Sequence, residues 1–442
     1  MQDEAILQES GALREALGKF RTRREWLASR EGAELAARLA RFMAPVRRHA
    51  PAATAPLGRG PGRDWIHSVH WNILHGGRYA GIVASLRREP ALARADVLAL
   101  NEVDLGLARS ANRDVARDLA ADLGLHAVWA ATFLELEGGF GTPPELARAP
   151  QRESLMGSAL LSRFPLGEAR RIVLETPEDL LFDRERKAGS FIALVVEVLW
   201  PGSPFHVLVT HLDVHGTPER RERQMQAALD ALPRGAALVS GDLNTTTFAR
   251  GTWGRSASAL AVLALAPPAY LRGRLLRPHG PAGKPREPLF TVLARAGFEH
   301  APFNDGGPTL DLRLEDVHEL QSLPAPVRRL GRGLLRHVER RTHHRLDWIA
   351  ARGFEPAPER APFTLMHLAR GAEAVSDHAA IGCGVRLART SHVGAPRVGA
   401  SEVGTTEVGT SQVGASQEGA GSAELRSASN PPALPGSRVP EA

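Results

Sequence analysis

Polar residues capable of acid–base and metal chemistry stand at the ends of apolar stretches in this 442-residue chain. The pattern recurs in the segments HWNIL, LALNEVD, LVTHLD, VSGDLNT, RLDWIA and VSDHAA. The residues concerned are Asn72, Glu102, His211, Asp242, Asn244, Asp347, Asp377 and His378. A single case would be explained as a turn residue, or as a histidine with an ordinary polar neighbour. The recurrence weakens that explanation, because each further buried carboxylate adds a desolvation cost.

Carboxylates, amides and imidazoles gathered at one place suit the hydrolysis of a phosphate ester. The anionic oxygens of such an ester repel a nucleophile, so an enzyme must neutralise charge, position a water and assist the leaving oxygen. An oxygen ligand such as Glu102 suits Mg²⁺ or Mn²⁺ and disfavours zinc, which prefers nitrogen and sulfur. His343 and His344 are adjacent and lack zinc-site spacing, so we expect them to face solvent.

The segments that carry these residues are predicted to be strands of one α/β domain, from residue 63 to 388. They are apolar or β-branched and mostly end in Gly, Pro, Asn or Asp. The predicted strands cover 66–73, 95–102, 158–164, 190–200, 205–212 and 236–244, followed by RLDWIAA and HAAIGCGVRL. Helices are predicted between them, one from Asn112 to Leu123 before Gly124, and one starting at Thr217 with Pro218 in its first turn. If these strands share a sheet, their polar ends meet at one rim.

The motifs WNI, NE, THL, GDLNT, LDWI and SDH occur in this order across the central domain. This set resembles the endonuclease/exonuclease/phosphatase superfamily of metal-dependent phosphohydrolases, which includes deoxyribonuclease-like enzymes. Two of the motifs, GDLNT and SDH, are short and individually weak, but all six in order are specific. The resemblance implies a four-layer α/β/β/α sandwich, in which two mixed β-sheets are flanked by helices and the active site lies at one edge.

The resemblance also implies a metal site and a cofactor. Its ligands would be Glu102, with Asn72 and Asp377 nearby, and its metal Mg²⁺ or Mn²⁺.

The remaining residues of the set take catalytic roles on the same resemblance. Asp242 would orient or deprotonate the attacking water, and Asn244 would steady the phosphate and the carboxylate. His378 would sit on the scissile phosphate, held by Asp347, which favours its charged form. His211 would hydrogen-bond the phosphate or the leaving oxygen. Whether His378 or Asp242 is the general base stays open.

Two features depart from the common pattern or allow two interpretations. Many relatives carry Gly-Asn-Ala where this chain has Gly157-Ser158-Ala159, which puts a phosphate or backbone contact in doubt. Arg109 and Arg113 follow the metal ligand at the start of a predicted helix and could bind a second phosphate. They could equally be solvent-facing charges paired with Asp114 or Asp118, and we slightly favour this second interpretation.

The flanks of the central domain differ from it in composition. Residues 1–62 are predicted to form a helical region followed by a Pro/Gly-rich linker, and residues 389–442 a disordered low-complexity tail with Val-Gly repeats. A basic segment at 326–345 could contact a membrane surface or nucleic acid. An ordinary amphipathic surface helix explains that segment better.

Bulk properties set weaker limits on function. The net charge of +6 is compatible with anionic partners or with arginine-rich usage alone, and the single cysteine, Cys383, excludes an intramolecular disulfide. The longest apolar runs start at Phe191 and Ser258 and are too short to span a bilayer, so we expect a soluble, cytoplasmic protein. The predicted function is Mg²⁺-dependent hydrolysis of a phosphate ester, whose substrate could be a nucleic acid, a phospholipid or a small phosphate. The alternative is a non-catalytic module on the same fold that binds nucleic acid or lipid.

Overall fold

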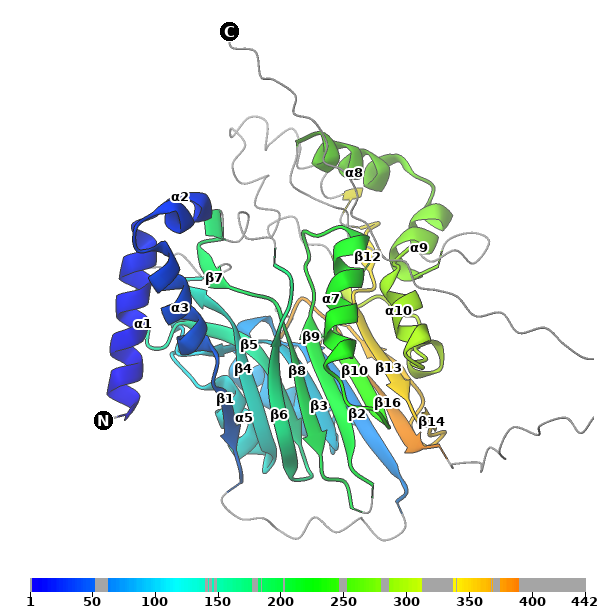
Figure 1. Cartoon of the computed structure of the whole chain (residues 1–442). Helices are drawn as coiled ribbons and strands as arrows, with labels where there is room; N and C mark the ends of the chain where they lie inside the picture. Colours follow the sequence, from blue (N-terminus) through cyan, green and yellow to red (C-terminus); the bar gives the residue numbers. More distant parts are fainter. Residues whose placement is uncertain are drawn as a thin grey trace, which may run out of the picture. The chain divides into compact units, whose positions relative to one another are not determined.

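The computed structural model of the chain (Figure 1) describes most of residues 2–388. The described ranges are 2–51, 63–139, 142, 145–146, 149–176, 182–183, 185–201, 203–245, 253–279, 286–311, 337–338, 340–366, 368 and 374–388. The predicted tail at 389–442, nearly all of the predicted linker and much of the basic segment at 326–345 lie outside the described residues. Among the described residues, no helix has the length and apolar character needed to cross a lipid bilayer.

Two large β-sheets form the centre of the described part of the chain. The first runs in the order β1-β4-β5-β3-β2-β16-β14, with β7 paired to β4 and β15 paired to β16. Its strands are β1 (Val46–His49), β2 (Trp65–Asn72), β3 (Val97–Leu105), β4 (His126–Glu135), β5 (Leu155–Ser162), β7 (Lys187–Gly189), β14 (Phe354–Pro356), β15 (Phe363–Leu365) and β16 (Ala380–Leu387).

The second sheet runs in the order β13-β10-β9-β8-β6. Its strands are β6 (Leu166–Val173), β8 (Ile192–Val198), β9 (Phe205–His211), β10 (Ala237–Asp242) and β13 (Asp347–Arg352). A separate small ribbon joins β11 (Leu310–Asp311) to β12 (His343–His344). In that ribbon His343 is exposed but His344 is buried, so the expectation of two solvent-facing histidines is wrong for His344.

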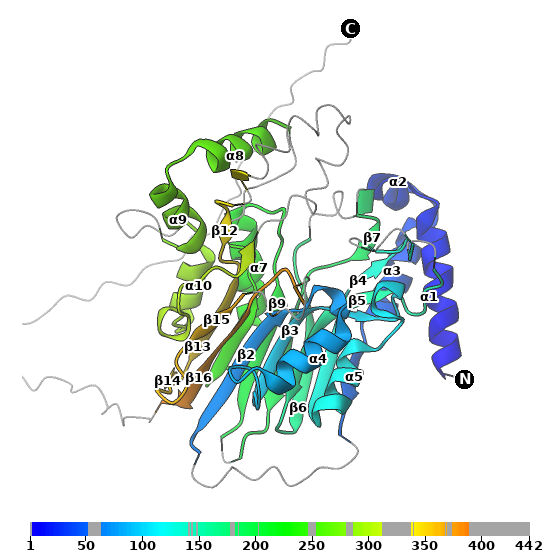
Figure 2. The same cartoon turned by 180° about the vertical axis from the view of Figure 1, so that it is seen from behind.

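Helices cover the outer faces of both sheets (Figures 1 and 2). Their bounds are α1 (Gln2–Gly18), α2 (Arg23–Ala28), α3 (Gly32–Met43), α4 (Tyr79–Arg88), α5 (Val115–Leu123), α7 (Pro218–Asp230), α8 (Trp253–Leu265), α9 (Pro268–Leu276) and α10 (Leu289–Arg295). Short 3₁₀ turns are η1 (Leu74–Gly76), η2 (Ala108–Ser110) and η4 (Ala301–Phe303). The two helix predictions correspond to α5, capped by Asp114 and Gly124, and to α7, capped by Thr217.

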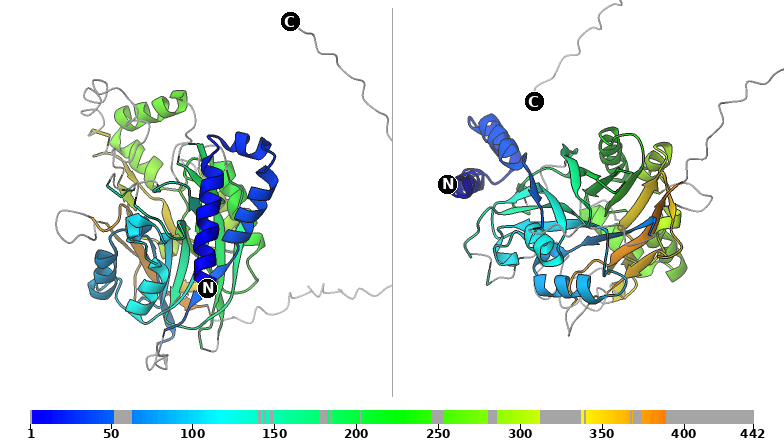
Figure 3. Two further views of the ribbon diagram at one scale, coloured as in Figure 1. Left: turned by 90° about the vertical axis from the view of Figure 1, so that its left-hand side faces the viewer. Right: turned by 90° about the horizontal axis from the view of Figure 1, so that it is seen from below.

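Alternating side chains along each strand separate the apolar layers. In β8, Ile192 and Leu194 face the core between the sheets, whereas Ala193 and Val195 face the layer beneath α7 and α10. A third apolar cluster covers the outer face of the first sheet beneath α4 and α5 and continues to α1 and α3, which lie at the edge of that sheet near β1 and β7 (Figure 3). Figure 3 shows the same layers from the side and from below. The predicted fold class, a four-layer α/β/β/α sandwich, is confirmed.

The N-terminal region does not form a core separate from the sandwich. Leu35, Leu39 and Met43 repeat at helical spacing in α3 and are buried in the layer on the first sheet. The chain then enters β1, which pairs with β4 from Val46↔Ala130 onward. The predicted boundary at residue 62/63 therefore cuts through one packed unit. Sequence analysis missed β1 because its residues, Val-Arg-Arg-His, show no apolar alternation.

A cavity-forming substitution in α3 tests this integration. We expect Leu39→Ala to lower the free energy of unfolding of the whole unit by about 2–5 kcal/mol, because it removes a buried side chain from the shared core. Urea unfolding followed by tryptophan fluorescence and by circular dichroism measures this. The matched control, Leu27→Ala, removes a leucine that is 46% exposed and should change little. An early, separate transition that alone responds to Leu39→Ala would contradict the shared core.

Candidate active site

Three strands of the second sheet align polar residues in one row. The register pairs Asp242 of β10 with His211 of β9 on one side and with Asp347 of β13 on the other. Gly241 allows this close arrangement, because a Cβ at that position would lie 2.0 Å from the carbonyl oxygen of Thr210. The glycine of the GDLNT motif is thus required by the neighbouring backbone.

The first sheet brings an amide and a carboxylate to the same place. Asn72, at the end of β2, places its Nδ2 3.1 Å from Oε1 of Glu102 and 3.3 Å from Oδ2 of Asp242. Glu102 lies in β3 where the register against β5 shifts, and its φ of +52° is in the left-handed region. A non-glycine residue adopts this conformation only where the surrounding structure enforces it. The bulge turns the Glu102 side chain toward the second sheet, and that side chain remains 18% exposed.

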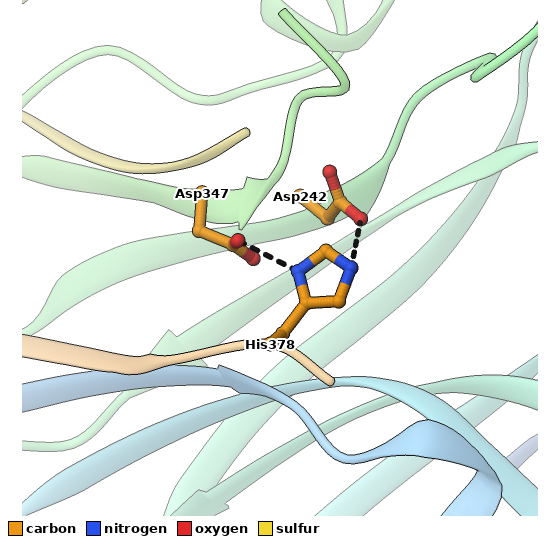
Figure 4. Close-up of side chains that lie close together, drawn as sticks. All are labelled: Asp242, Asp347 and His378. Atoms are coloured by element: carbon orange, nitrogen blue, oxygen red, sulfur yellow. Dashed lines mark hydrogen bonds and ion pairs between the residues drawn. The ribbon is translucent and has the colours of Figure 1, made fainter. Parts of the chain in front are cut away.

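Asp347 is fully buried between two histidines. Its Oδ2 is 2.8 Å from Nδ1 of His378 (Figure 4), and its Oδ1 is 2.9 Å from Nε2 of His70. Burial alone would raise the pKa of the Asp347 carboxyl, but the charge of His378 and the hydrogen bonds from both imidazoles outweigh burial and lower it. Asp347 is therefore ionised and holds the ring of His378 in one orientation.

The ring of His378 is poised as a cation. Burial would lower its pKa, but the negative charges of Asp347 and Asp242 raise it well above its ordinary value. Its second nitrogen, Nε2, lies 3.7 Å from Oδ2 of Asp242. The backbone of this turn is fixed by Ser376, whose Oγ accepts from the N–H of His378 and donates to the carbonyl oxygen of Asn72.

His211 and Asn244 complete the surroundings of Asp242. His211 places Nε2 3.6 Å from Oδ2 of Asp242, and its side chain is 15% exposed. The backbone N–H of Asn244 donates to Oδ1 of Asp242, and its Nδ2 donates to the carbonyl oxygen of Leu212. Asn244 also has a left-handed φ, +49°. The carboxylate of Asp242 is thus contacted on both oxygens.

The donor set fits a hard divalent cation at Glu102. Its carboxylate reaches solvent. Asp377 directly precedes His378 in the chain, and its Oδ1 lies 3.3 Å from Oγ of Ser376. The oxygen of Asn72 accepts from the N–H of Leu74, so in this orientation the amide presents its nitrogen to the carboxylates. A second group, Asp242, Asp347 and His378, also has ligand atoms within 4.8 Å of one another. That group is less suited to a metal, because both oxygens of Asp347 already accept from imidazoles.

Arg109 and Arg113 have different surroundings, so neither of the two predicted arrangements holds for both residues. Arg109 lies in η2 and is buried, with a bidentate ion pair to Asp104 at 2.9 Å for both contacts. Burial alone would lower the pKa of the Arg109 guanidinium, but the charge of Asp104 outweighs burial and raises that pKa above its ordinary value. Arg113 is exposed and pairs with Asp118, as the favoured interpretation had it. Neither residue lies in the helix, which begins at Val115. Arg109 is correspondingly ill placed to bind a second phosphate.

Three buried residues of the site were missed by sequence analysis. His70 contacts Asp347, and His75 places Nδ1 3.4 Å from Oε2 of Glu102. Burial, then the charge of Arg109, keeps the pKa of His75 well below its ordinary value. The only available signals were their positions two residues before and three residues after Asn72 of the WNI motif.

The third missed residue, Asn101, connects the sheets together with Ser158, which sequence analysis had named. Asn101 accepts from the backbone N–H of Asp242 at 2.9 Å, and its Nδ2 donates to Oγ of Ser158 at 2.9 Å. Ser158, the departure from Gly-Asn-Ala, is therefore buried behind the site and acts through Asn101.

The family model described as Endonuclease/Exonuclease/phosphatase family matches residues 69–378, a range that includes every residue of this site. No curated protein matches the sequence. Among solved structures, an endonuclease/exonuclease/phosphatase from Beutenbergia cavernae DSM 12333 is similar at 18% identity, with a TM-score of 0.43 and coverage of 74% of this chain and 72% of that chain. The human Nocturnin catalytic domain with bound sulfate is similar at 17% identity, with a TM-score of 0.40 and coverage of 79% and 98%. Humanized D. rerio TDP2 is similar at 14% identity, with a TM-score of 0.36 and coverage of 73% and 100%.

The pH dependence of stability tests the charged state of His378. Because its folded-state pKa is raised, its contribution is fully present below the unfolded value of about 6.5 and is lost as pH rises toward the folded value. Between these two values the wild-type free energy of unfolding should fall by up to about 1.4 kcal/mol per pH unit more steeply than that of His378→Gln. Urea unfolding in EDTA at pH 6 to 9 measures both slopes. Equal slopes would mean that His378 is neutral in the folded protein.

Proposed function

The chain belongs to the endonuclease/exonuclease/phosphatase family, and from this membership we propose that it is a metal-dependent hydrolase that cleaves a phosphate ester by attack of an activated water. The observation that carries the proposal is the position of His378 between the carboxylates of Asp242 and Asp347. Oδ2 of Asp242 faces Nε2 of His378, whose Nδ1 is occupied by Asp347.

This arrangement divides the proton chemistry between two groups. His378 is already protonated, so it serves as a hydrogen-bond donor and a positive charge for a phosphate oxygen at its Nε2. Asp242 is then the group that accepts a proton from the attacking water, with its carboxylate oriented by Asn72 and by the backbone of Asn244. This favours Asp242 over His378 as the general base.

The other residues bind and orient the ester. His211, next to Asp242 and partly exposed, is placed to hydrogen-bond the phosphate or the leaving oxygen. Glu102, with Asp377 and Asn72, would hold Mg²⁺ or Mn²⁺; Asn72 would do so only after its amide turns, because its oxygen accepts from the N–H of Leu74 and its nitrogen faces Glu102. When bound, such an ion neutralises charge on the phosphate and stabilises the leaving oxygen.

Substrate hydrolysis by a base variant tests the reaction class. We expect metal-dependent hydrolysis of at least one of bis-p-nitrophenyl phosphate, p-nitrophenyl phosphate, plasmid DNA and sphingomyelin. Asp242→Asn should lower that rate by about 10³-fold or more, because the amide cannot take the proton. The matched control is Asp230→Asn, an exposed carboxylate on α7. No turnover of any of the four substrates would favour the non-catalytic binding module.

Metal binding can be tested without turnover. Millimolar Mg²⁺ or Mn²⁺ should raise the thermal midpoint of the wild type by about 2 °C or more, because a ligand that binds only the folded state stabilises it. Glu102→Gln should abolish this shift, whereas Glu168→Gln, at an exposed carboxylate of β6, should keep it. A shift that survives Glu102→Gln would remove Glu102 from the metal site.

A further inference from the structure

The helices α8 and α9 are inserted in the chain between β10 and β13, the strands that carry Asp242 and Asp347. Thr245, three residues after Asp242, donates through Oγ1 to the carbonyl oxygen of Arg345 at 2.9 Å. The N–H of Arg345 in turn donates to the carbonyl oxygen of Leu275 in α9 at 2.9 Å. The helical pair therefore attaches to the chain two residues from Asp347, at the edge of the sandwich that holds the candidate site (Figure 1).

The turn between α8 and α9 presents apolar side chains to solvent. Leu265 is 81% exposed and Tyr270 is 51% exposed, and the residues Pro267, Pro268 and Ala269 between them are exposed as well. We call these five residues the apolar tip. The opposite sides of the same helices are buried in a small cluster of their own, formed by Leu263, Ala264, Leu271, Leu275 and Val338. The helical pair thus has a small core of its own, and the residues of the apolar tip are not buried in it.

The stretch of sequence that carries the apolar tip has charges of one sign. Residues 245–286 contain no aspartate or glutamate and seven basic residues. They are Arg250, Arg255, Arg272, Arg274, Arg277, Lys284 and Arg286. Of these, Arg272 and Arg277 are exposed on and just after α9. The rest of the chain mixes both signs, with 49 acidic residues against 48 basic ones. An acid-free stretch next to an exposed apolar turn therefore has a local electrostatic preference for an anionic surface.

Apolar exposure distinguishes a lipid surface from a nucleic acid as the partner. Phosphate contacts in nucleic acids use cations and hydrogen-bond donors, and they give no reason to leave a leucine in water. A leucine and a tyrosine at a tip, with arginines behind them, is the arrangement that enters the boundary between headgroups and acyl chains. We propose that the apolar tip of α8 and α9 inserts into the surface of an anionic lipid bilayer and holds the candidate site over phosphate esters of lipid headgroups. The identity of the ester as substrate rests on the proposed hydrolase function, whereas the docking does not.

Vesicle binding tests the docking independently of turnover. The full chain carrying Asp242→Asn is mixed with vesicles of phosphatidylcholine alone or of phosphatidylcholine with phosphatidylserine, and the bound fraction is measured by sedimentation. We expect binding to the anionic vesicles, and a loss of about tenfold in affinity with Leu265→Asp, because a charge replaces the side chain that enters the bilayer. The matched control is Leu199→Asp. Leu199 is 40% exposed and follows Val198, which lies at the end of β8 away from His211.

The outcomes separate the docking from the chemistry. Tyr270→Ser repeats the test with a neutral change, and both tip variants in an otherwise wild-type chain should hydrolyse bis-p-nitrophenyl phosphate at the wild-type rate. Equal binding to anionic vesicles by the Asp242→Asn chain with and without Leu265→Asp would overturn the proposal. An equal loss of vesicle binding with Leu199→Asp would overturn it as well. Loss of single-stranded DNA binding in the tip variants without vesicle binding by the wild type would overturn it in favour of a nucleic acid. Vesicle binding without any hydrolysis would leave the docking in place and contradict only the proposed function.

Discussion

The carboxylate of Asp347 is charged and fully buried. Of the two imidazoles beside it, His70 comes from β2 of the first sheet and His378 from the turn before β16. A lone carboxylate in that position would be protonated or would disrupt the core, because burial of an unpaired charge is costly. The two sheets must therefore meet so that His70 on β2 reaches the end of β13. That meeting brings Asn72, two residues along β2, within hydrogen-bonding distance of Asp242 on the neighbouring strand. The alignment of the active-site row depends on this buried pairing.

Local backbone conformation supplies what the pairing alone does not. Glu102 and Asn244 both have left-handed φ values, which cost free energy in residues with a side chain. In each case neighbouring hydrogen bonds hold the backbone in place, from Asn72 to the Glu102 carboxylate and from the Asn244 backbone to Asp242. The site is thus held rigidly before any ligand arrives, which is the condition for electrostatic catalysis.

Sequence patterns were sufficient for the strands that end in a polar residue and for the order of the motifs. β2, β3, β9, β10, β13 and β16 lie where alternation and turn residues predicted them. β4 was missed although it is buried throughout, because an apolar run such as HAVWAATFLE, without regular polar alternation, cannot be distinguished from a buried helix by periodicity alone. The left-handed turns at Glu102 and Asn244 could not be predicted, because nothing in a single sequence marks a non-glycine residue for positive φ.

Partners of the site residues were harder to predict than the residues themselves. Arg109 looked like a surface cation beside a metal ligand, and only the bulge in β3 and the turn of η2 bring Asp104 to it. His70 was not singled out among the residues of its predicted strand, because its partner Asp347 lies 277 residues away in the chain. Long-range pairing of this kind depends on how the sheets stack, which local periodicity does not encode.

The edge of the first sheet has a consequence for how the chain can be divided. β4 pairs with β5 on one side, while its other side is covered by β1 from Ala127 to Ala130 and by β7 from Phe133 to Glu135. A fragment beginning at residue 63 would keep the whole candidate site, yet it would uncover half of this strand and the apolar face beneath α3. An unpaired, apolar strand edge recruits other chains. The N-terminal residues thus cover a length of β4 that would otherwise be open to pairing with another chain.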